Sequence, residues 1–324
     1  MNSLEEISRT LLRSKKIGIT YHVSPDGDAV GSALALLNGL RLLNKDAYLI
    51  SKDLISENLQ FLKNSSEAAG KVVKAEDGTE VVVVLDCGNF ERISADLCDY
   101  KGEIINIDHH ISNDKYGNKN YIDIKAAATA EIVFMLLEKL GVSFEEENDD
   151  IKEIATCLYT SLVTDTGAFR HSNVTSRTHL IASKLKNVGV NNTNIYENLF
   201  DSNSFEKMKL IGKALSNIEL LFNGKVALIR IPISYGKELG IEIGDTSDII
   251  SFALQIKGIE LAVLIKEIEN GSKVSLRSKT AFDVREIAEN LGGGGHVKAA
   301  GITFKNISLE EAEDKVLNEI RKVL

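Results

Sequence analysis

The stretch that decides the fold is IGITYHVSPDGD, residues 17–28, in which an apolar run passes directly into a polar turn. Residues 17–21 are rich in β-branched and aromatic side chains, which predicts a buried strand. The polar turn leads into a largely apolar segment at 29–43, whose length and spacing predict a helix. A strand, a polar turn and a helix in this order are typical of an α/β fold.

The same alternation continues through the first half of the chain. Ser3 and Glu6 have capping-box spacing ahead of an apolar stripe, which predicts a helix at the start. Short continuous apolar runs predict further strands, and longer periodic runs predict further helices. The predicted strands are 47–50, 81–85 and 104–107, and the predicted helices are 127–140, 151–164 and 176–186. This pattern predicts a parallel sheet with helices on both faces.

The pattern changes after residue 186. A polar, turn-prone cluster at 190–194 precedes the segment 195–200 and a long amphipathic helix predicted at 205–221. Beyond it, the predicted strands are 226–231, 261–267, 274–277 and 302–304, and the predicted helices are 284–290 and 309–323. We therefore predict an α/β domain over 1–186, a helical linker over 187–212 and a smaller α+β domain over 213–324.

The composition limits the cellular setting. The length of 324 residues suggests about two domains, and 44% hydrophobic with 26% charged residues is ordinary for a globular protein. The apolar runs are far shorter than the ~18–20 residues of a membrane span, and the acidic N-terminus lacks an apolar signal core. Three cysteines without CxxC spacing favour a reducing compartment. We expect a cytoplasmic protein with no membrane partner.

The charge balance limits the partners. Acidic residues number 47 and basic residues 38, which gives a formal net charge of −9. Such a surface repels long nucleic acid unless a basic stripe is present, and the sequence contains none, so we expect no binding of long duplex DNA. Small anionic substrates remain open, because a metal site supplies local positive charge.

Polar groups gather where the predicted strands end. Ligands of open α/β sheets bind at the carboxyl ends of the strands, so the groups at these ends are expected to lie together. A fourth group sits near the end of the helix predicted at 151–164. The four groups are the turn His22–Asp28, then Asp86, then Asp108-His109-His110, and finally Asp165.

Five carboxylates and three imidazoles in these groups cannot share one pocket as free anions, since they would repel one another or take up protons. Two divalent cations resolve the conflict. Oxygen and imidazole ligands without thiolate favour Mn²⁺, with Mg²⁺, Co²⁺ or Fe²⁺ as substitutes and Zn²⁺ left open. Taken singly, Asp86 fits a turn former or helix cap, and His22 fits a structural histidine. The prediction rests on their combination.

The motifs resemble those of a known family. The first half of the chain resembles the DHH phosphoesterase superfamily in HVSPDGDAVGS at 22–32, in Asp86, in Asp108-His109-His110 and in Asp165. The stretch GGGGHVKAAG at 292–301 resembles the DHHA1 C-terminal domain of that superfamily. The resemblance covers nearly the whole chain in the expected order. It is greatest to the stand-alone branch of NrnA-like proteins, which are nano-RNases and pAp phosphatases.

The resemblance implies how the site residues divide their roles. One metal would be held by His22, Asp26 and Asp86, and the other by Asp28, Asp86, His109 and Asp165. Asp86 would then bridge two Mn²⁺ ions. Asp108 would fix the tautomers of the neighbouring histidines, and His110 would face the substrate phosphate as a catalytic residue.

The resemblance also assigns substrate binding to the second domain. Arg277 offers a bidentate fork for phosphate, and consecutive glycines let backbone N–H groups approach one closely. The implied residues for the terminal phosphate or nucleotide are Arg277, Ser278, Gly293, Gly294, Gly295 and His296. A flexible glycine loop and a surface ion pair of Arg277 remain alternatives. Arg170 either reaches the substrate phosphate or pairs with an acid, and Cys87 is expected to fill the core.

The function implied by the resemblance is Mn²⁺-dependent hydrolysis of phosphoesters. The substrates would be short single-stranded RNA, cut to mononucleotides, and 3′-phosphoadenosine 5′-phosphate (pAp), cut to AMP. The alternatives are a cyclic-di-AMP or pApA phosphodiesterase, a RecJ-like single-strand exonuclease and a non-catalytic nucleotide-binding regulator. A family II pyrophosphatase is not expected to carry the glycine run. The oligomeric state stays open, a homodimer included.

Overall fold

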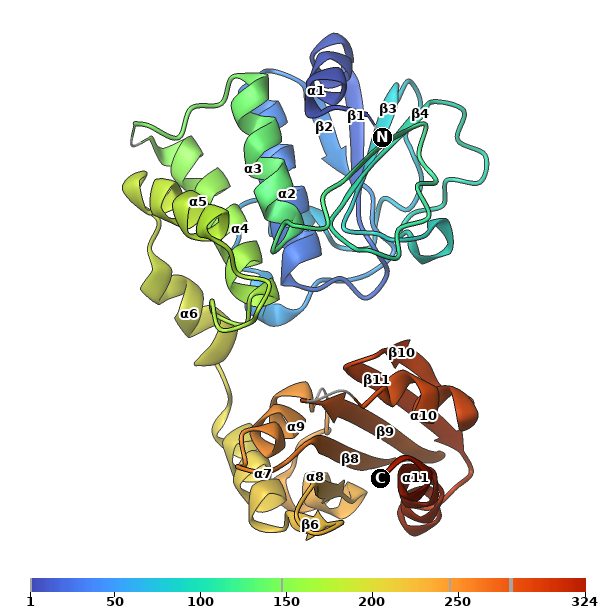
Figure 1. The fold of residues 1–324 in the computed structure, drawn as a ribbon. Helices are drawn as coiled ribbons and strands as arrows, with labels where there is room; N and C mark the ends of the chain where they lie inside the picture. Colours follow the sequence, from blue (N-terminus) through green and yellow to red (C-terminus); the bar gives the residue numbers. More distant parts are fainter. Residues whose placement is uncertain (1, 147, 245, 280–281) are drawn as a thin grey trace. The chain divides into compact units, whose positions relative to one another are not determined.

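The computed structural model describes residues 2–146, 148–244, 246–279 and 282–324. The chain divides into two compact units, Met1–Ser202 and Asn203–Leu324, each with its own sheet (Figure 1). The division between Ser202 and Asn203 lies within the segment 187–212 that was predicted as the linker. Among the described residues, no helix combines the length and apolar character needed to cross a bilayer.

The first unit is built on a five-stranded sheet in the order β2-β1-β3-β4-β5, with every pair parallel. The strands are β1 (Lys16–Thr20), β2 (Asp46–Leu49), β3 (Val81–Leu85), β4 (Glu103–Asp108) and β5 (Lys119–Ile122). The predicted parallel sheet is confirmed. Strand β5 was not predicted, because the edge sequence KNYI is polar and only its last residue is buried.

The helices of this unit form one large core with the sheet. They are α1 (Leu4–Arg13), α2 (Gly27–Leu42), α3 (Thr129–Leu140), α4 (Asp149–Asp165), α5 (Ser176–Asn187) and α6 (Asn192–Phe200). The predicted capping box of Ser3 and Glu6 is present at α1. We predicted helices on both faces of the sheet. On the opposite face the sheet packs against residues 87–97, which contain a short 3-10 helix (Phe90–Arg92) and no α-helix.

Two glycines of α2 set its distance from α4. A Cβ at Gly31 would lie 2.6 Å from the carbonyl oxygen of Cys157, and one at Gly27 would lie 2.4 Å from a methyl of Thr164. Only glycine therefore allows this close approach of the two helices. The packing brings the beginning of α2, with Asp26 and Asp28, against the end of α4, with Asp165.

The second unit has a mixed six-stranded sheet in the order β10-β11-β9-β8-β7-β6, in which only β7 and β8 pair in parallel. The strands are β6 (Glu219–Leu221), β7 (Val226–Ile231), β8 (Leu261–Ile268), β9 (Gly271–Ser278), β10 (Gly294–His296) and β11 (Ala299–Lys305). Alternating residues of β7 and β8 face two separate cores. The predicted α+β class of this part is confirmed.

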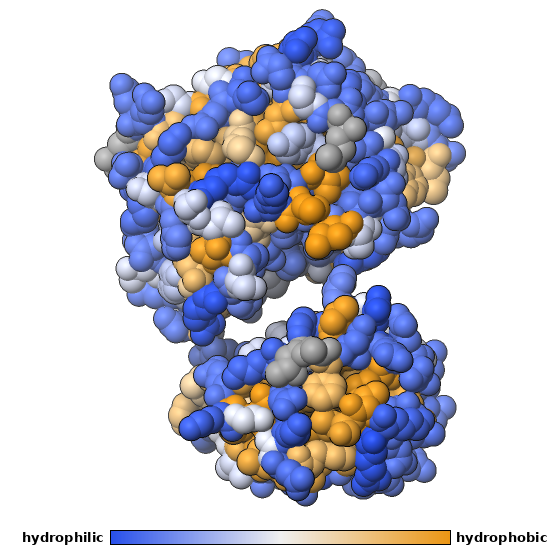
Figure 2. Space-filling view, in the orientation of Figure 1, coloured by the Kyte–Doolittle hydropathy of each residue, from blue (hydrophilic) through white to orange (hydrophobic). Residues whose placement is uncertain are grey.

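Helices cover both faces of the second sheet. Helices α10 (Val284–Asn290) and α11 (Leu309–Val323) pack on one face, and α7 (Phe205–Ser216) and α9 (Ser247–Leu254) pack on the other. Helix α8 (Ile233–Leu239) lies beside them. On the face drawn in Figure 2, hydrophilic residues dominate each unit and apolar areas are scattered, as expected for units that enclose their cores.

The prediction of one long helix over 205–221 is wrong. Helix α7 ends at Ser216, and Glu219–Leu221 forms β6, which pairs antiparallel with β7. The apolar residues of this segment fit a helical stripe as well as a strand, and pairing with β7 decides between them. Helices α8 and α9 and strand β10 were not predicted, since each is short.

Candidate metal centre

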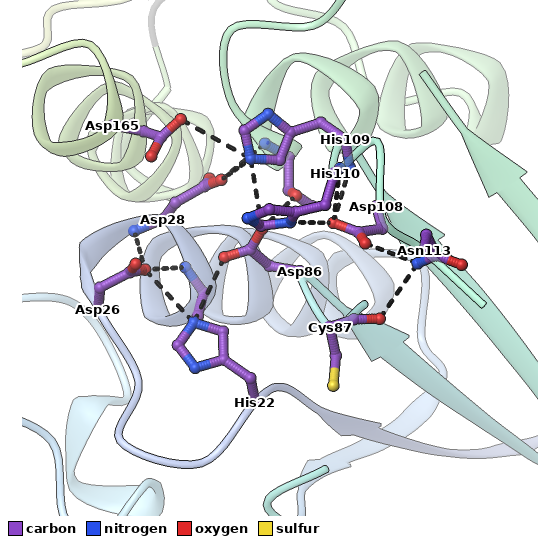
Figure 3. Close-up of polar contacts among 12 residues, drawn as sticks. His22, Asp26, Asp28, Asp86, Cys87, Asp108, His109, His110, Asn113 and Asp165 are labelled. Carbon is purple, nitrogen blue, oxygen red and sulfur yellow. Dashed lines mark hydrogen bonds and ion pairs between the residues drawn. The ribbon is translucent and has the colours of Figure 1, made fainter. Parts of the chain in front are cut away.

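The structure brings together the eight side chains that were predicted to meet at the carboxyl ends of the strands (Figure 3). His22 follows β1, and Asp86 follows β3. Asp26 is the N-cap of α2, and Asp165 is the last residue of α4. The eight are His22, Asp26, Asp28, Asp86, Asp108, His109, His110 and Asp165.

Hydrogen bonds to backbone carbonyls orient two of the histidines. His22 Nδ1 lies 2.9 Å from the carbonyl oxygen of Val23, and His109 Nδ1 lies 3.2 Å from that of Ala126. A carbonyl only accepts, so each Nδ1 must carry the proton. The lone pair of each neutral ring is then on Nε2, which points into the cluster, as a metal ligand requires.

Carboxylate oxygens surround these two Nε2 atoms at a characteristic spacing. His22 Nε2 lies 3.8 Å from Asp26 and 3.6 Å from Asp86. His109 Nε2 lies 3.7 Å from Asp28, 3.6 Å from Asp86 and 3.7 Å from Asp165. These separations exceed a hydrogen bond. They match ligand atoms that share one ion, because two atoms at about 2.1 Å from a cation lie about 3–4 Å apart.

Asp86 lies between the two groups. Its Oδ2 faces His22, and its Oδ1 faces His109. Thr129 Oγ1 donates a 2.9 Å hydrogen bond to the same Oδ1, which fixes the carboxylate plane. The backbone of Asp86 is left-handed, with a φ of 53°, a conformation that costs on the order of 1 kcal/mol for a residue with a side chain. The turn after β3 is thus strained in a way that aims one oxygen at each group.

Asp28 is almost fully buried and held by several donors. The backbone N–H groups of Thr129 and Ala130 donate to it over 2.7 and 3.2 Å at the start of α3, and the hydroxyls of Ser32 and Ser161 donate to its Oδ1. Burial, together with repulsion from Asp86 and Asp165, raises the pKa of Asp28 well above its usual value. The carboxylate is fixed in place before any ligand arrives.

Asp108 differs from the other carboxylates because hydrogen bonds already satisfy both of its oxygens. Oδ1 accepts from the backbone N–H of His109 and from Nδ1 of His110, each over 2.7 Å, and Oδ2 accepts from Asn113 over 2.6 Å. These bonds outweigh burial and lower the pKa of Asp108. They leave Asp108 to orient His110, whose pKa the Asp108 hydrogen bond raises to about 9. The ring of His110 is part-exposed.

The charges of the cluster call for a cation. Burial, reinforced by Asp86 and only partly offset by His109, raises the pKa of Asp165 to about 6. Burial opposes protonation of His22, yet the carboxylates of Asp26 and Asp86 raise the pKa of His22 to about 10. The cluster thus binds protons tightly at the lone pairs that a metal would use. Its oxygen and imidazole donors suit divalent cations, and they form three overlapping groups that could hold one: His22 with Asp26 and Asp86, Asp28 with His109 and Asp165, and Asp86 with Asp108, His109 and His110.

Three supporting residues escaped the prediction from sequence: Thr129, Asn113 and Ser161. Each reaches the cluster through a hydrogen bond to a residue already described. Asn113 also donates to the carbonyl of Cys87 over 3.2 Å, so it joins the strained turn after Asp86 to Asp108. Thr129 could have been found from the sequence, because it is a polar residue within the largely apolar stretch AAATAEIV at 126–133, and a buried polar side chain needs a hydrogen-bond partner.

The second unit places Arg277 and His296 in one row of the sheet. Both are paired with Ala299 of β11, Arg277 from β9 and His296 from β10. Directly opposed residues point to the same face, so their side chains rise from one face about 10 Å apart. Ser278, next along β9, alternates to the other face and is buried.

The glycine run is partly a strand rather than a loop. Gly294 and Gly295 belong to the edge strand β10, whose residues are all exposed, and Gly293 precedes it. A Cβ at Gly295 would lie 2.5 Å from the Ala299 carbonyl oxygen. In the first unit, Arg170 is exposed and donates to the carbonyl of Gly167 over 2.8 Å. Cys87 is buried in the core, as expected.

Comparison with known proteins identifies both units. The family model of the DHH family, N-terminal domain, matches residues 16–162, and that of the DHHA1 domain matches residues 223–324. The "Bifunctional oligoribonuclease and PAP phosphatase NrnA" of Thermus thermophilus is 35% identical over 95% of this chain and 90% of its own length. The protein of the same name from Bacillus subtilis is 26% identical over 97% and 96%.

A solved structure agrees with this relation. The crystal structure of an exopolyphosphatase-related protein from Bacteroides fragilis has a TM-score of 0.90 and 28% sequence identity, covering 98% of this chain and 95% of that one. The two matched ranges contain all the predicted site residues except Asp165 and Arg170, which lie between the ranges. The chain therefore belongs to the DHH phosphoesterase family, with a DHH domain followed by a DHHA1 domain.

Proposed function

We propose that this protein hydrolyses phosphoesters of small nucleotides with two divalent cations, preferably Mn²⁺. The substrates are short single-stranded RNA, cut to mononucleotides, and pAp, cut to AMP. The observation that carries the proposal is the carboxylate of Asp86, whose two oxygens face two separate groups of ligand atoms.

The proposed ligands follow the geometry of the cluster. His22, Asp26 and Asp86 hold one cation, and Asp28, Asp86, His109 and Asp165 hold the other. When bound, two such ions activate a water molecule and neutralise charge on a phosphoryl group. The protein fixes their positions through the Nδ1–H bonds of the two histidines and the donors around Asp28.

His110 acts on the substrate, and Asp108 orients His110. The bond from His110 Nδ1 to Asp108 leaves Nε2 at the other end of a part-exposed ring. The hydrogen bond to Asp108, which does not depend on the cations, raises the pKa of His110 and favours the protonated ring, whose Nε2–H donates to a phosphoryl oxygen. A positively charged donor at this point stabilises the charge that grows on the phosphoryl oxygens in the transition state.

The second unit is proposed to bind the nucleotide end of the substrate. The row of Arg277 and His296 presents a guanidinium and an imidazole on one face, and Gly294 and Gly295 lie in the exposed strand beside them. Gly293 precedes this strand, and its own N–H donates to the carbonyl of Ala288 over 2.8 Å. This set suits a phosphate. Ser278 follows Arg277 in β9, but its side chain is buried on the other face of the sheet. We therefore propose no contact between the Ser278 hydroxyl and the phosphate. Arg170 is proposed to contact phosphate near Asp165.

The small size of the substrate is supported by charge and by the relatives. A net charge of −9 disfavours long nucleic acid, and the two relatives named above are called oligoribonuclease and PAP phosphatase. A cyclic-di-AMP or pApA phosphodiesterase and a RecJ-like exonuclease use the same type of centre and are the catalytic alternatives. A nucleotide-binding regulator would have no use for strain at Asp86 or for an oriented His110.

One hydrolysis panel in Mn²⁺ tests the proposal. It compares pAp, RNA of two to five nucleotides, long single-stranded DNA, cyclic di-AMP, linear pApA and pyrophosphate, with the Asp86→Asn variant as the background control. We expect phosphate release from pAp and mononucleotides from the short RNA. Faster turnover of cyclic di-AMP or long DNA would favour an alternative enzyme, and no turnover on any ester with two metals bound would favour the regulator.

A further inference from the structure

The loop between β5 and α3 contacts ligands of both proposed cations. The carbonyl of Ala126 accepts from Nδ1 of His109 over 3.2 Å and so sets the tautomer of that ring. At the end of the loop, Thr129 donates its N–H to Asp28 over 2.7 Å and its hydroxyl to Asp86 over 2.9 Å. A small shift of this loop would therefore move ligand atoms at both positions.

Arg177, at the start of α5, fastens both ends of this loop. Its Nη1 lies 2.8 Å from Oδ2 of Asp123, at the beginning of the loop. Its Nε lies 2.6 Å from Oε2 of Glu131, just after the loop in the first turn of α3. Glu131 is fully buried, and its other oxygen accepts a 2.6 Å hydrogen bond from the hydroxyl of Thr178. One guanidinium thus joins two carboxylates that flank the loop.

A second contact holds the loop near its end. Asn173 Nδ2 donates to the carbonyl of Ala127 over 2.9 Å and lies 3.3 Å from that of Asp165. Asn173 and Arg177 both follow α4 in the chain, so this part of the chain holds the loop on both sides and also at Ala127.

We propose that Arg177 is a positioning residue for the two-cation centre, which acts through the β5–α3 loop on His109, Asp28 and Asp86. The inference rests on the proposed function and adds to it a residue that touches neither metal nor substrate. Loss of the guanidinium would leave the buried carboxylate of Glu131 without its cation and would release both ends of the loop. Residues that orient metal ligands typically change metal affinity about 10- to 100-fold when they are replaced.

The chain offers a matched control in Arg41. Its guanidinium binds both oxygens of Glu67 over 2.5 and 2.8 Å, and its side chain is 36% exposed, against 35% for Arg177. The pair joins α2 to a surface segment and contacts none of the proposed ligands. Replacing Arg41 therefore removes a guanidinium with two ion-pair contacts and leaves the β5–α3 loop unchanged.

The test is Mn²⁺ binding to the full chain after chelation, measured by calorimetry, with the melting temperature of the metal-free protein measured alongside. We expect Arg177→Met to weaken Mn²⁺ binding about 10- to 100-fold and Arg41→Met to leave it unchanged. Arg177→Lys keeps a charge beside Glu131 but cannot reach both carboxylates, so it should fold normally and bind Mn²⁺ with intermediate affinity.

Wild-type affinity in Arg177→Met would overturn the inference, as would an equal loss in Arg41→Met. If Arg177→Met does not fold, the Mn²⁺ affinity of Arg177→Lys decides. A wild-type Mn²⁺ affinity in Arg177→Lys would then overturn the inference. Failure of the proposed function has a different signature, because the unaltered protein would then hydrolyse neither pAp nor short RNA, whereas failure of this inference shows only in the Mn²⁺ affinity of the Arg177 variants.

Discussion

The two units carry their proposed chemistry in opposite ways. In the first, Asp28 and Asp86 are at most 2% exposed, and each is fixed by hydrogen bonds from other elements. In the second, every residue of β10 is exposed, and the glycines contribute backbone groups only. Figure 3 shows the convergence of side chains that the first unit achieves.

This difference fits what each unit is proposed to hold. Fixed, buried donors suit ions, which require ligands at set distances and tolerate little variation. An exposed strand edge with one arginine and one histidine suits a flexible anionic ligand that arrives with its own hydration. We therefore expect substitutions in the first unit to change turnover and substitutions in the second to change substrate affinity.

The largest effect is expected for Asp86→Asn. The variant keeps the shape but loses the charge that faces both histidines, so Mn²⁺ stoichiometry should fall and turnover should drop about 1000-fold or more. Mass spectrometry for bound metal and a steady-state assay on pAp measure the two effects. An active variant with two bound ions would remove Asp86 from its bridging role.

The next largest effect is expected for His110→Ala. A positioned proton donor contributes about 100- to 10,000-fold, so turnover should fall within that range while both cations remain bound. The same two assays separate the roles. Loss of metal in this variant would mean that His110 is a ligand rather than a group that faces the phosphate.

A smaller effect, on KM alone, is expected for Arg277→Ala. Hydrogen bonds to charged groups contribute about 1.5–3 kcal/mol, so KM for pAp should rise about 10- to 100-fold with little change in kcat. Arg285→Ala is the control, since Arg285 lies on α10 of the same unit and pairs with Asp283. An unchanged KM in Arg277→Ala would exclude it from the site.

The smallest effects contrast two helical glycines. Gly31→Ala adds a Cβ where α2 meets α4 and should destabilise folding by about 1–3 kcal/mol. Gly212 of α7 has open space around it, so Gly212→Ala should stabilise the protein by up to about 1 kcal/mol. Urea unfolding measures both. Equal effects would show that the close approach at Gly31 is not what fixes the beginning of α2.

Much of the fold was predictable because the periodic patterns are strong. Strand β3 and helices α10 and α11 match their predicted ranges, and each has a continuous or regularly spaced apolar set. The edge strand β5 and the end of α7 were missed or misjudged, since polar edges and short apolar segments carry no distinctive period. Their structure is decided by pairing with β4 and β7, which lie elsewhere in the chain.

The cluster was predictable from topology, whereas its supports were not. Polar groups after parallel strands meet at one edge, and this rule brought the residues after β1, β3 and β4 together. Thr129 and Arg177 escaped because they act over hydrogen bonds to residues such as Asp28 and Glu131, far away in sequence. No spacing rule reports such contacts, which depend on the packed helices.

The most direct test of the central claim is anomalous X-ray diffraction at the manganese edge from crystals grown with Mn²⁺. The account predicts two peaks about 3.5–4 Å apart, one beside His22 and one beside His109, with the Asp86 carboxylate between them. A single peak, or peaks away from these histidines, would contradict a two-cation centre built on Asp86.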